Sequence, residues 1–120
     1  MPFWRVLSTL LCVILVFNLF YIGAKPVAVG LFQPPMDKVA HFCTFALITN
    51  LLWIGLLRRR PWLLICIASA IGAADEIHQI FLPGRSAGFD DFATDALAVV
   101  VMTVVLMWQT TRVNLPSKRN

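Results

Sequence analysis

The sequence predicts an all-α membrane protein, a bundle of four transmembrane helices, on three observations. First, 59% of the 120 residues are hydrophobic and only 13% are charged, whereas a soluble domain is usually about half apolar. Second, mean hydropathy is +0.80. Third, four apolar runs are each close to the roughly 20 residues that cross a bilayer. The length allows a single domain over residues 1–120.

The first two spans are expected at residues 6–22 and 36–57. Gly23 and Pro26 end the first, and three arginines at 58–60 end the second. The first run could also be a secretory signal peptide. Its apolar stretch exceeds the about 7–15 residues of such a segment, so we expect an uncleaved helix.

The last two spans are expected at residues 61–82 and 89–108. Pro61 suits the first turn of a helix, and Pro83-Gly84 ends the third run. A polar tail follows the fourth. With four spans, the N-terminus, the middle loop and the C-terminus share one side of the membrane.

Basic residues predict the orientation. Seven of the ten Lys and Arg residues fall on the side of the termini: Arg5, Arg58, Arg59, Arg60, Arg112, Lys118 and Arg119. The other side holds Lys25, Lys38 and Arg85. Because cytoplasmic loops are enriched in basic residues, we expect both termini to be cytoplasmic.

Other classes are disfavoured by composition. The net charge is +4, but no basic stripe alternates with stacking aromatics, so we expect no nucleic-acid partner. Cys12, Cys43 and Cys66 lie inside apolar runs without CxxC spacing. This favours small hydrophobic side chains over a disulfide framework.

The acidic residues and histidines gather at one end. All six carboxylates and both histidines fall in the expected extracytoplasmic half: Asp37, His41, Asp75, Glu76, His78, Asp90, Asp91 and Asp95. Residues four apart share a helix face. Three helices carry such polar pairs at similar depth: Asp37 with His41, Asp75 with Gln79, and Asp91 with Asp95. We therefore expect one shared site.

Asp75 lies within its span, where an ionised carboxylate costs roughly 2.5–3.5 kcal/mol near mid-bilayer. Its expected partners are Arg85, Lys38 or a histidine. Arg85 is the sole basic residue of the Pro/Gly-rich loop at 82–88. It suits either an anion clamp or a structural ion pair with Asp75, Glu76 or Asp91.

Helix capping with a favourable dipole interaction is the simplest interpretation of Asp90. Asp37 could also be a cap, with Lys38 extending to the interface. Neither accounts for His41 and Asp95, one turn deeper. Within the spans, Thr49 and Thr103 are expected to hydrogen-bond between helices, and glycines to allow close helix approach.

Three segments resemble the signatures of VanZ-like membrane proteins. They are Asp37-Lys38-Val39-Ala40-His41, the run from Asp75-Glu76 through Gln79, Phe81 and Pro83 to Arg85, and Asp91-Phe92-Ala93-Thr94-Asp95. The family pattern reads approximately D-K-x-x-H, D-E-x-x-Q-x-F-x-P-x-R and D-x-x-x-N. The resemblance covers roughly residues 36 to 105. Asp95 departs from it, since a carboxylate replaces the amide donor.

The resemblance implies a small multi-pass protein of the bacterial inner membrane. The founding member is associated with low-level resistance to teicoplanin, a glycopeptide that acts outside the cytoplasmic membrane. The resemblance implies no particular reaction, and drug resistance need not be the ancestral role.

Two main hypotheses follow, and the sequence leaves open whether the protein is an enzyme. In the first, the protein binds or protects an envelope lipid or glycolipid through Asp37, Lys38, Gln79, Arg85, Asp91 and Asp95. In the second, an intramembrane enzyme uses acid–base chemistry from His41, Asp75, Glu76 and His78.

Two histidines with carboxylates could hold a divalent metal, but no known signature supports one, and we expect neither metal nor cofactor. Transport ranks last, because the polar groups stop at mid-bilayer. Besides membrane lipids, a second copy of the chain is an expected partner, through glycine-bearing faces.

Overall fold

Four long helices form the structure, a computed structural model that describes residues 1–114. They are α1 (Phe3–Gly23), α2 (Met36–Leu52), α3 (Pro61–Ile80) and α4 (Phe89–Val113). A π-helical turn, η2 (Trp53–Leu57), extends α2, and a short 3₁₀ turn, η1 (Pro26–Ala28), follows α1. The predicted all-α class is confirmed. Lys118 and Arg119, used in the orientation argument, lie outside the described residues.

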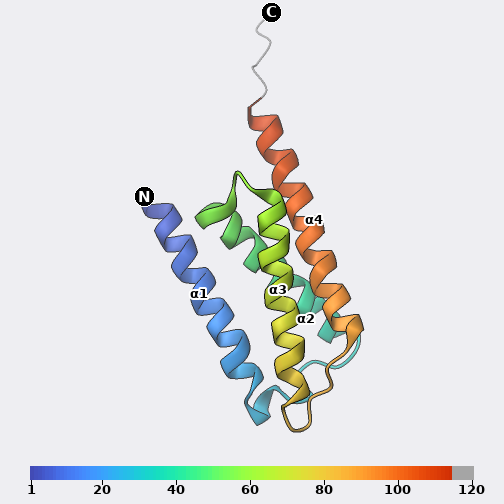
Figure 1. Ribbon diagram of the computed structural model, residues 1–120. Helices are drawn as coiled ribbons and strands as arrows, with labels where there is room; N and C mark the ends of the chain where they lie inside the picture. The colour runs from blue at the N-terminus through green and yellow to red at the C-terminus, as the bar shows by residue number, and fades with distance from the viewer. Residues whose placement is uncertain (115–120) are drawn as a thin grey trace, which may run out of the picture.

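The helices α1, α3 and α4, and α2 together with η2, are each long and apolar enough to cross a membrane. The protein is therefore a multi-pass membrane protein. Figure 1 shows the N-terminus, the α2–α3 loop and the end of α4 at one end of the bundle, and the other two loops at the opposite end.

Helices α2, α3 and α4 make the core. Phe45 and Ile48 of α2, Leu64 and Ala68 of α3, and Val99 of α4 are completely buried. Gly72 lets α3 and α4 approach, since a Cβ there would lie 3.3 Å from Asp95 Cβ. Small residues at such crossings allow the dispersion contacts that hold membrane helices together.

Helix α1 lies beside this core and buries little. Only Ser8 and Cys12 are buried in it. Ser8 Oγ donates to the Leu51 carbonyl over 2.8 Å, and Arg5 Nε donates to the Gly55 carbonyl over 2.9 Å. Both acceptors lie at or just before η2, where a π-helical turn shifts the backbone hydrogen-bond pattern. The backbone at and just before this turn thus offers carbonyls to α1.

The two threonines behave differently from the prediction. Thr49 Oγ1 donates to the Phe45 carbonyl and Thr103 Oγ1 to the Val99 carbonyl, each four residues earlier in the same helix. The expected bonds between helices are therefore wrong for both. Buried hydroxyls satisfy themselves on the i−4 carbonyl when no neighbouring helix offers an acceptor.

Candidate functional site

The polar stripes of α2 and α4 meet directly. His41 Nδ1 hydrogen-bonds to Asp95 Oδ1 over 2.9 Å. One turn nearer the loops, Lys38 Nζ of α2 lies 2.8 Å from Asp90 Oδ2 and also contacts Asp91 Oδ1, both in the first turn of α4. The contacts repeat one turn apart because side chains three or four residues apart share a helix face.

Helix α3 brings two further carboxylates. Asp75 is 2% exposed and accepts a hydrogen bond from Gln79 Nε2 over 3.0 Å. Glu76 is 8% exposed, and its Oε2 accepts from the Gly88 backbone N–H, also over 3.0 Å. Gly88 precedes α4, so Glu76 fixes the end of the α3–α4 loop.

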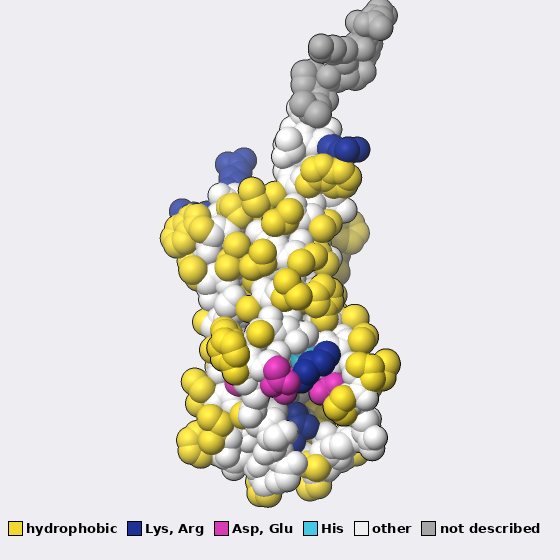
Figure 2. Space-filling view, turned by 90° about the vertical axis from the view of Figure 1, so that its right-hand side faces the viewer, with side chains coloured by type: hydrophobic (Ala, Val, Ile, Leu, Met, Phe, Trp, Pro, Cys, Tyr) yellow, Lys and Arg dark blue, Asp and Glu magenta, His cyan; other side chains and the backbone are white. Residues whose placement is uncertain are grey.

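A cavity of about 510 Å³ opens beside these groups. All four helices, the loop between α1 and α2, and the loop after α3 line it, with α4 contributing Asp91. Its polar lining includes Asn18, Asp37, His41, Thr44, Asp75, Gln79, Arg85, Ser86 and Asp91, and its apolar walls include Leu15, Leu19, Ile22, Leu31 and Phe32. Figure 2 shows acidic, basic and histidine side chains clustered toward this end of the bundle, below a predominantly apolar body.

Arg85 lies in the cavity lining without a carboxylate partner. Its Nη1 donates to the Ala28 carbonyl over 2.8 Å. Within residues 1–114, the ion pairs engage Lys38 and His41 and leave Arg85 out. Of the two alternatives for Arg85, the ion pair with Asp75, Glu76 or Asp91 does not form among the described residues. Asp75 bonds to Gln79 instead of an expected cationic partner. The guanidinium joins the two loops while its charge stays uncompensated by direct contact.

The ammonium group of Lys38 contacts three carboxylates. Besides Asp90 and Asp91, its Nζ lies 3.3 Å from Asp37 Oδ2. It therefore links α2 to α4. Since three carboxylates surround one ammonium group, Lys38 has little positive charge left for an external anion.

Neither Asp37 nor Asp90 is an N-cap residue, so the capping part of their interpretation is wrong, whereas the dipole part agrees with the structure. Pro35 and Gly88 occupy the N-cap positions of α2 and α4, and neither makes a side-chain cap hydrogen bond. Asp37 and Asp90 lie in the first turns instead, where the helix dipole favours a negative charge. Both also contact Lys38.

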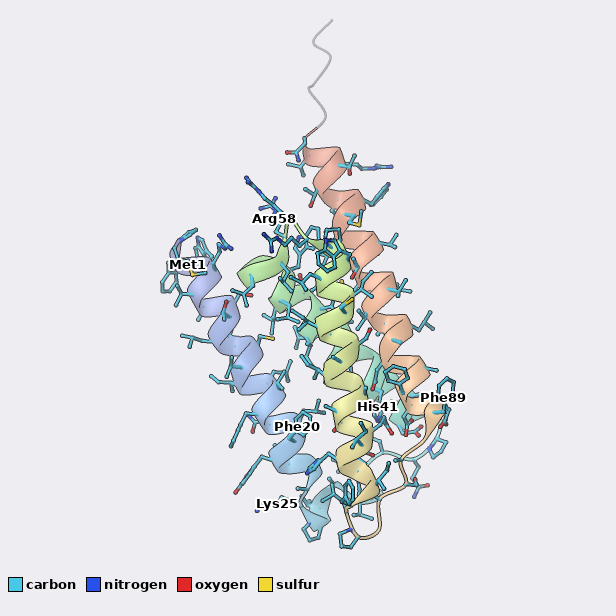
Figure 3. The ribbon with its side chains drawn as sticks, in the orientation of Figure 1. Met1, Phe20, Lys25, His41, Arg58 and Phe89 are labelled. Atoms are coloured by element: carbon cyan, nitrogen blue, oxygen red, sulfur yellow. The ribbon has the colours of Figure 1, made fainter. Side chains whose placement is uncertain are left out.

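His78 is separated from the other predicted acid–base residues. It lies on the side of α3 that faces α1, with its ring 5.3 Å from the ring of Phe20. It is not among the residues that line the cavity. In Figure 3, His41 lies near the start of α4, which Phe89 marks, whereas Phe20 lies on α1 across α3 from it.

Buried atoms without partners remain in the cluster. Among the described residues, Glu76 Oε1, Asp95 Oδ2, Asp37 Oδ1 and His78 Nδ1 are buried and form no hydrogen bond. Most buried polar groups in proteins do find a partner. Two of these four atoms belong to carboxylates that are more than nine-tenths buried, Glu76 and Asp95.

The sequence did not predict the contribution of α1 and its following loop. Asn18 and the apolar wall residues of α1 line the cavity, and the Ala28 carbonyl holds Arg85. Asn18 did carry a signal, since it is an amide inside an otherwise apolar run. The Ala28 carbonyl carried none, because every residue has one.

Comparison with known proteins agrees with the motifs. No curated protein and no solved structure was similar enough to match the chain. The family model VanZ/LLP1 matches residues 3–110, which include all four helices up to the last turn of α4. The resemblance to VanZ-like proteins is thus confirmed, and the chain belongs to the VanZ/LLP1 family.

Proposed function

We propose that the cavity binds the anionic headgroup of an envelope lipid or glycolipid, with Arg85 as the anchor. One observation carries the proposal: Arg85 lines a cavity of about 510 Å³ and, among residues 1–114, its side chain bonds only to a neutral carbonyl, although six carboxylates gather at the same end. A guanidinium so placed is available to bind phosphate or carboxylate through two parallel hydrogen bonds.

The remaining lining suits the rest of such a ligand. Leu15, Leu19 and Ile22 of α1 form an apolar wall, and the outer surface of α1 is largely exposed apolar side chains. An acyl chain could extend along this wall into the bilayer. Gln79 and Asn18 offer amide groups for sugar or glycerol hydroxyls.

Lipid mass spectrometry on gently purified protein tests the proposal. Arg85→Lys keeps the charge and loses the planar fork, and Arg85→Gln loses both. We expect retention of one anionic lipid class to fall stepwise from wild type to Lys to Gln. Arg112→Gln is the matched control, because Arg112 stacks on Trp108 far from the cavity. Equal lipid profiles in all four proteins would refute the proposal.

The orientation belongs to the same proposal. We place the cavity at the extracytoplasmic face of a bacterial inner membrane, because Arg5, Arg58, Arg59 and Arg60 lie at the other end of the bundle. A membrane-impermeant thiol reagent should label a cysteine introduced at Ser86 in intact cells, but not one introduced at Arg59. The reverse pattern would overturn this orientation.

A link to glycopeptide resistance fits this position. Teicoplanin carries an acyl chain and acts outside the membrane, so a protein that binds a lipid there could alter its target. Expression of the wild type should lower susceptibility to teicoplanin, and Arg85→Gln should abolish the effect at equal protein level. Unchanged susceptibility with the wild type would remove the link and leave the binding proposal intact.

An enzyme remains the second candidate, favoured by the hydrogen bond between the cavity-lining His41 and the buried Asp95. A carboxylate that orients a histidine is a common feature of general-base sites. Turnover of a lipid-linked substrate that His41→Gln abolishes would support catalysis. His78→Gln should have little effect, because His78 faces Phe20.

A second copy of the chain would have to bind through surfaces other than the expected glycine-bearing faces. A Cβ at Gly55 would lie 2.5 Å from Thr9 Oγ1, and one at Gly72 would lie 3.3 Å from Phe45. Both glycines therefore face helices of their own chain. We propose that pairing, if it occurs, uses the exposed apolar surfaces of α1 or α4.

A further inference from the structure

The site holds more negative charge than its cations compensate. Lys38 contacts Asp37, Asp90 and Asp91. The other three carboxylates, Asp75, Glu76 and Asp95, are the buried ones, at 2%, 8% and 0% exposure.

Their partners are mostly neutral: an amide side chain for Asp75, a backbone N–H for Glu76, and the imidazole of His41 for Asp95. Burying several carboxylates without a matching cation is costly, because water no longer solvates them.

Glu76 and Asp95 each have one anchored oxygen and one free oxygen. Gly88 holds Glu76 Oε2, and His41 holds Asp95 Oδ1. The second oxygens, Glu76 Oε1 and Asp95 Oδ2, are buried without a partner among residues 1–114. A carboxylate fixed at one oxygen and free at the other is a suitable metal ligand whose orientation is already set.

The three side chains lie close enough to share one ion. A ring nitrogen of His41 and one oxygen each of Glu76 and Asp95 lie within 4.8 Å of one another. Ligands at about 2.0–2.2 Å from Zn²⁺ can be at most about 4.4 Å apart. Side-chain movements of a few tenths of an ångström would therefore close the group around a metal.

We infer that His41, Glu76 and Asp95 form a binding site for one divalent metal ion. An imidazole with two carboxylates suits borderline cations such as Zn²⁺ or Mn²⁺ better than Mg²⁺, which prefers oxygen ligands and retains its waters. Three protein ligands leave at least one coordination position open. Since His41 also lines the cavity, that position borders the space in which we place the lipid headgroup.

The site would revise the expectation that no metal is bound. It does not depend on the proposed lipid function, since Arg85 is not a ligand. The two proposed carboxylate ligands, Glu76 and Asp95, are buried, which distinguishes them from the exposed acidic side chains. Asp90 is 70% exposed and bound to Lys38, so it offers a control carboxylate on the same helix as Asp95.

Metal titration of tag-free protein, stripped with a chelator, tests the inference. We expect the wild type to bind one equivalent of Zn²⁺ or Mn²⁺ and to show a higher Tm with the metal, with no such effect from Mg²⁺. Glu76→Gln and Asp95→Asn should each weaken binding about tenfold or more, since even second-shell changes weaken metal sites by about 10–100-fold. Asp90→Asn should bind as the wild type does.

Two results would overturn the site. The first is folded wild-type protein that binds neither Zn²⁺ nor Mn²⁺ stoichiometrically, which would mean that protons neutralise the carboxylates. The second is undiminished binding by the Glu76→Gln/Asp95→Asn double variant, which would mean adventitious surface binding. Arg85→Gln separates the two proposals, because it should lose lipid and keep the metal.

Discussion

The two halves of the α2–α3–α4 core contrast sharply. Toward the arginine-rich loop, Leu57, Leu64 and Leu106 pack with exposures of at most 9%, and the buried Thr103 bonds within its own helix. Toward the other loops, the same helices bury Asp75, Glu76 and Asp95. There, hydrogen bonds and ion pairs connect side chains of different helices.

This contrast suggests that one half of the three helices serves stability and the other half serves function. In the apolar half, the buried side chains pack against one another, and the hydroxyl of Thr103 has a hydrogen-bond acceptor in its own helix. The polar half contains carboxylate atoms that no residue in 1–114 satisfies. An unsatisfied buried polar group in a native protein is usually explained by a bound water, an ion or a functional role. Removing a buried apolar side chain from the first half should therefore destabilise the protein, whereas neutralising one of these unsatisfied carboxylates should not.

The largest effect on stability should come from the apolar half. Leu64 is completely buried, so Leu64→Ala leaves a cavity and should lower the free energy of unfolding by about 2–3 kcal/mol. Leu97→Ala is the control, because Leu97 is 57% exposed on the outside of the bundle, where the shorter side chain leaves no internal cavity. Thermal unfolding in detergent measures both. Similar losses for the two variants would contradict the assignment of the core.

The next effect concerns the contact of α1 with that half. A Cβ at Gly55 would meet Thr9 Oγ1 at 2.5 Å and Thr9 N at 3.2 Å. Gly55→Ala should therefore displace α1 and lower stability by about 1–3 kcal/mol. Gly23→Ala should be neutral, because nothing lies within 4 Å of a Cβ there. Lipid retention should fall with Gly55→Ala as well, because α1 forms one wall of the cavity.

Hydropathy and breaker residues predicted the helices because these signals are local. The structure starts α1 at Phe3 rather than residue 6, ends α3 at Ile80 rather than 82, and ends α4 at Val113 rather than 108. The widened turn η2 was not predictable. The carbonyls of Gly55 in this turn and of Leu51 just before it accept hydrogen bonds from Arg5 and Ser8, which are more than 40 residues away in the sequence.

The sequence predicted which residues form the site better than it predicted which of them bond to one another. Helix periodicity placed His41 and Asp95 on the polar faces of their helices, and the two side chains do form a hydrogen bond. The same periodicity could not show that Lys38 would contact three carboxylates, or that Arg85 would bond to the Ala28 backbone. Those choices depend on the helix crossing and on loop paths, which local patterns do not determine.

Lys38 tests whether the polar half contributes to stability at all. Lys38→Gln removes the ammonium group shared by Asp37, Asp90 and Asp91. Its side chain is 34% exposed, so water and salt screen the pairs, and we expect a loss of about 1 kcal/mol. Lys25→Gln, which loses only an exposed contact with Tyr21, should cost less. A chemical-denaturant titration at low and high salt measures the difference, which should shrink as salt rises.

The smallest effect should have the opposite sign. Glu76→Gln keeps an oxygen that can accept from Gly88 and removes a buried charge whose second oxygen has no partner. Replacing an uncompensated buried charge by a neutral group is often stabilising, so metal-free Glu76→Gln should be more stable than metal-free wild type by about 0.5–1 kcal/mol. With Zn²⁺ present the order should reverse, because only the wild type gains binding energy. A loss of stability in the metal-free variant would mean that Glu76 is structural, and the contrast between the two halves would disappear.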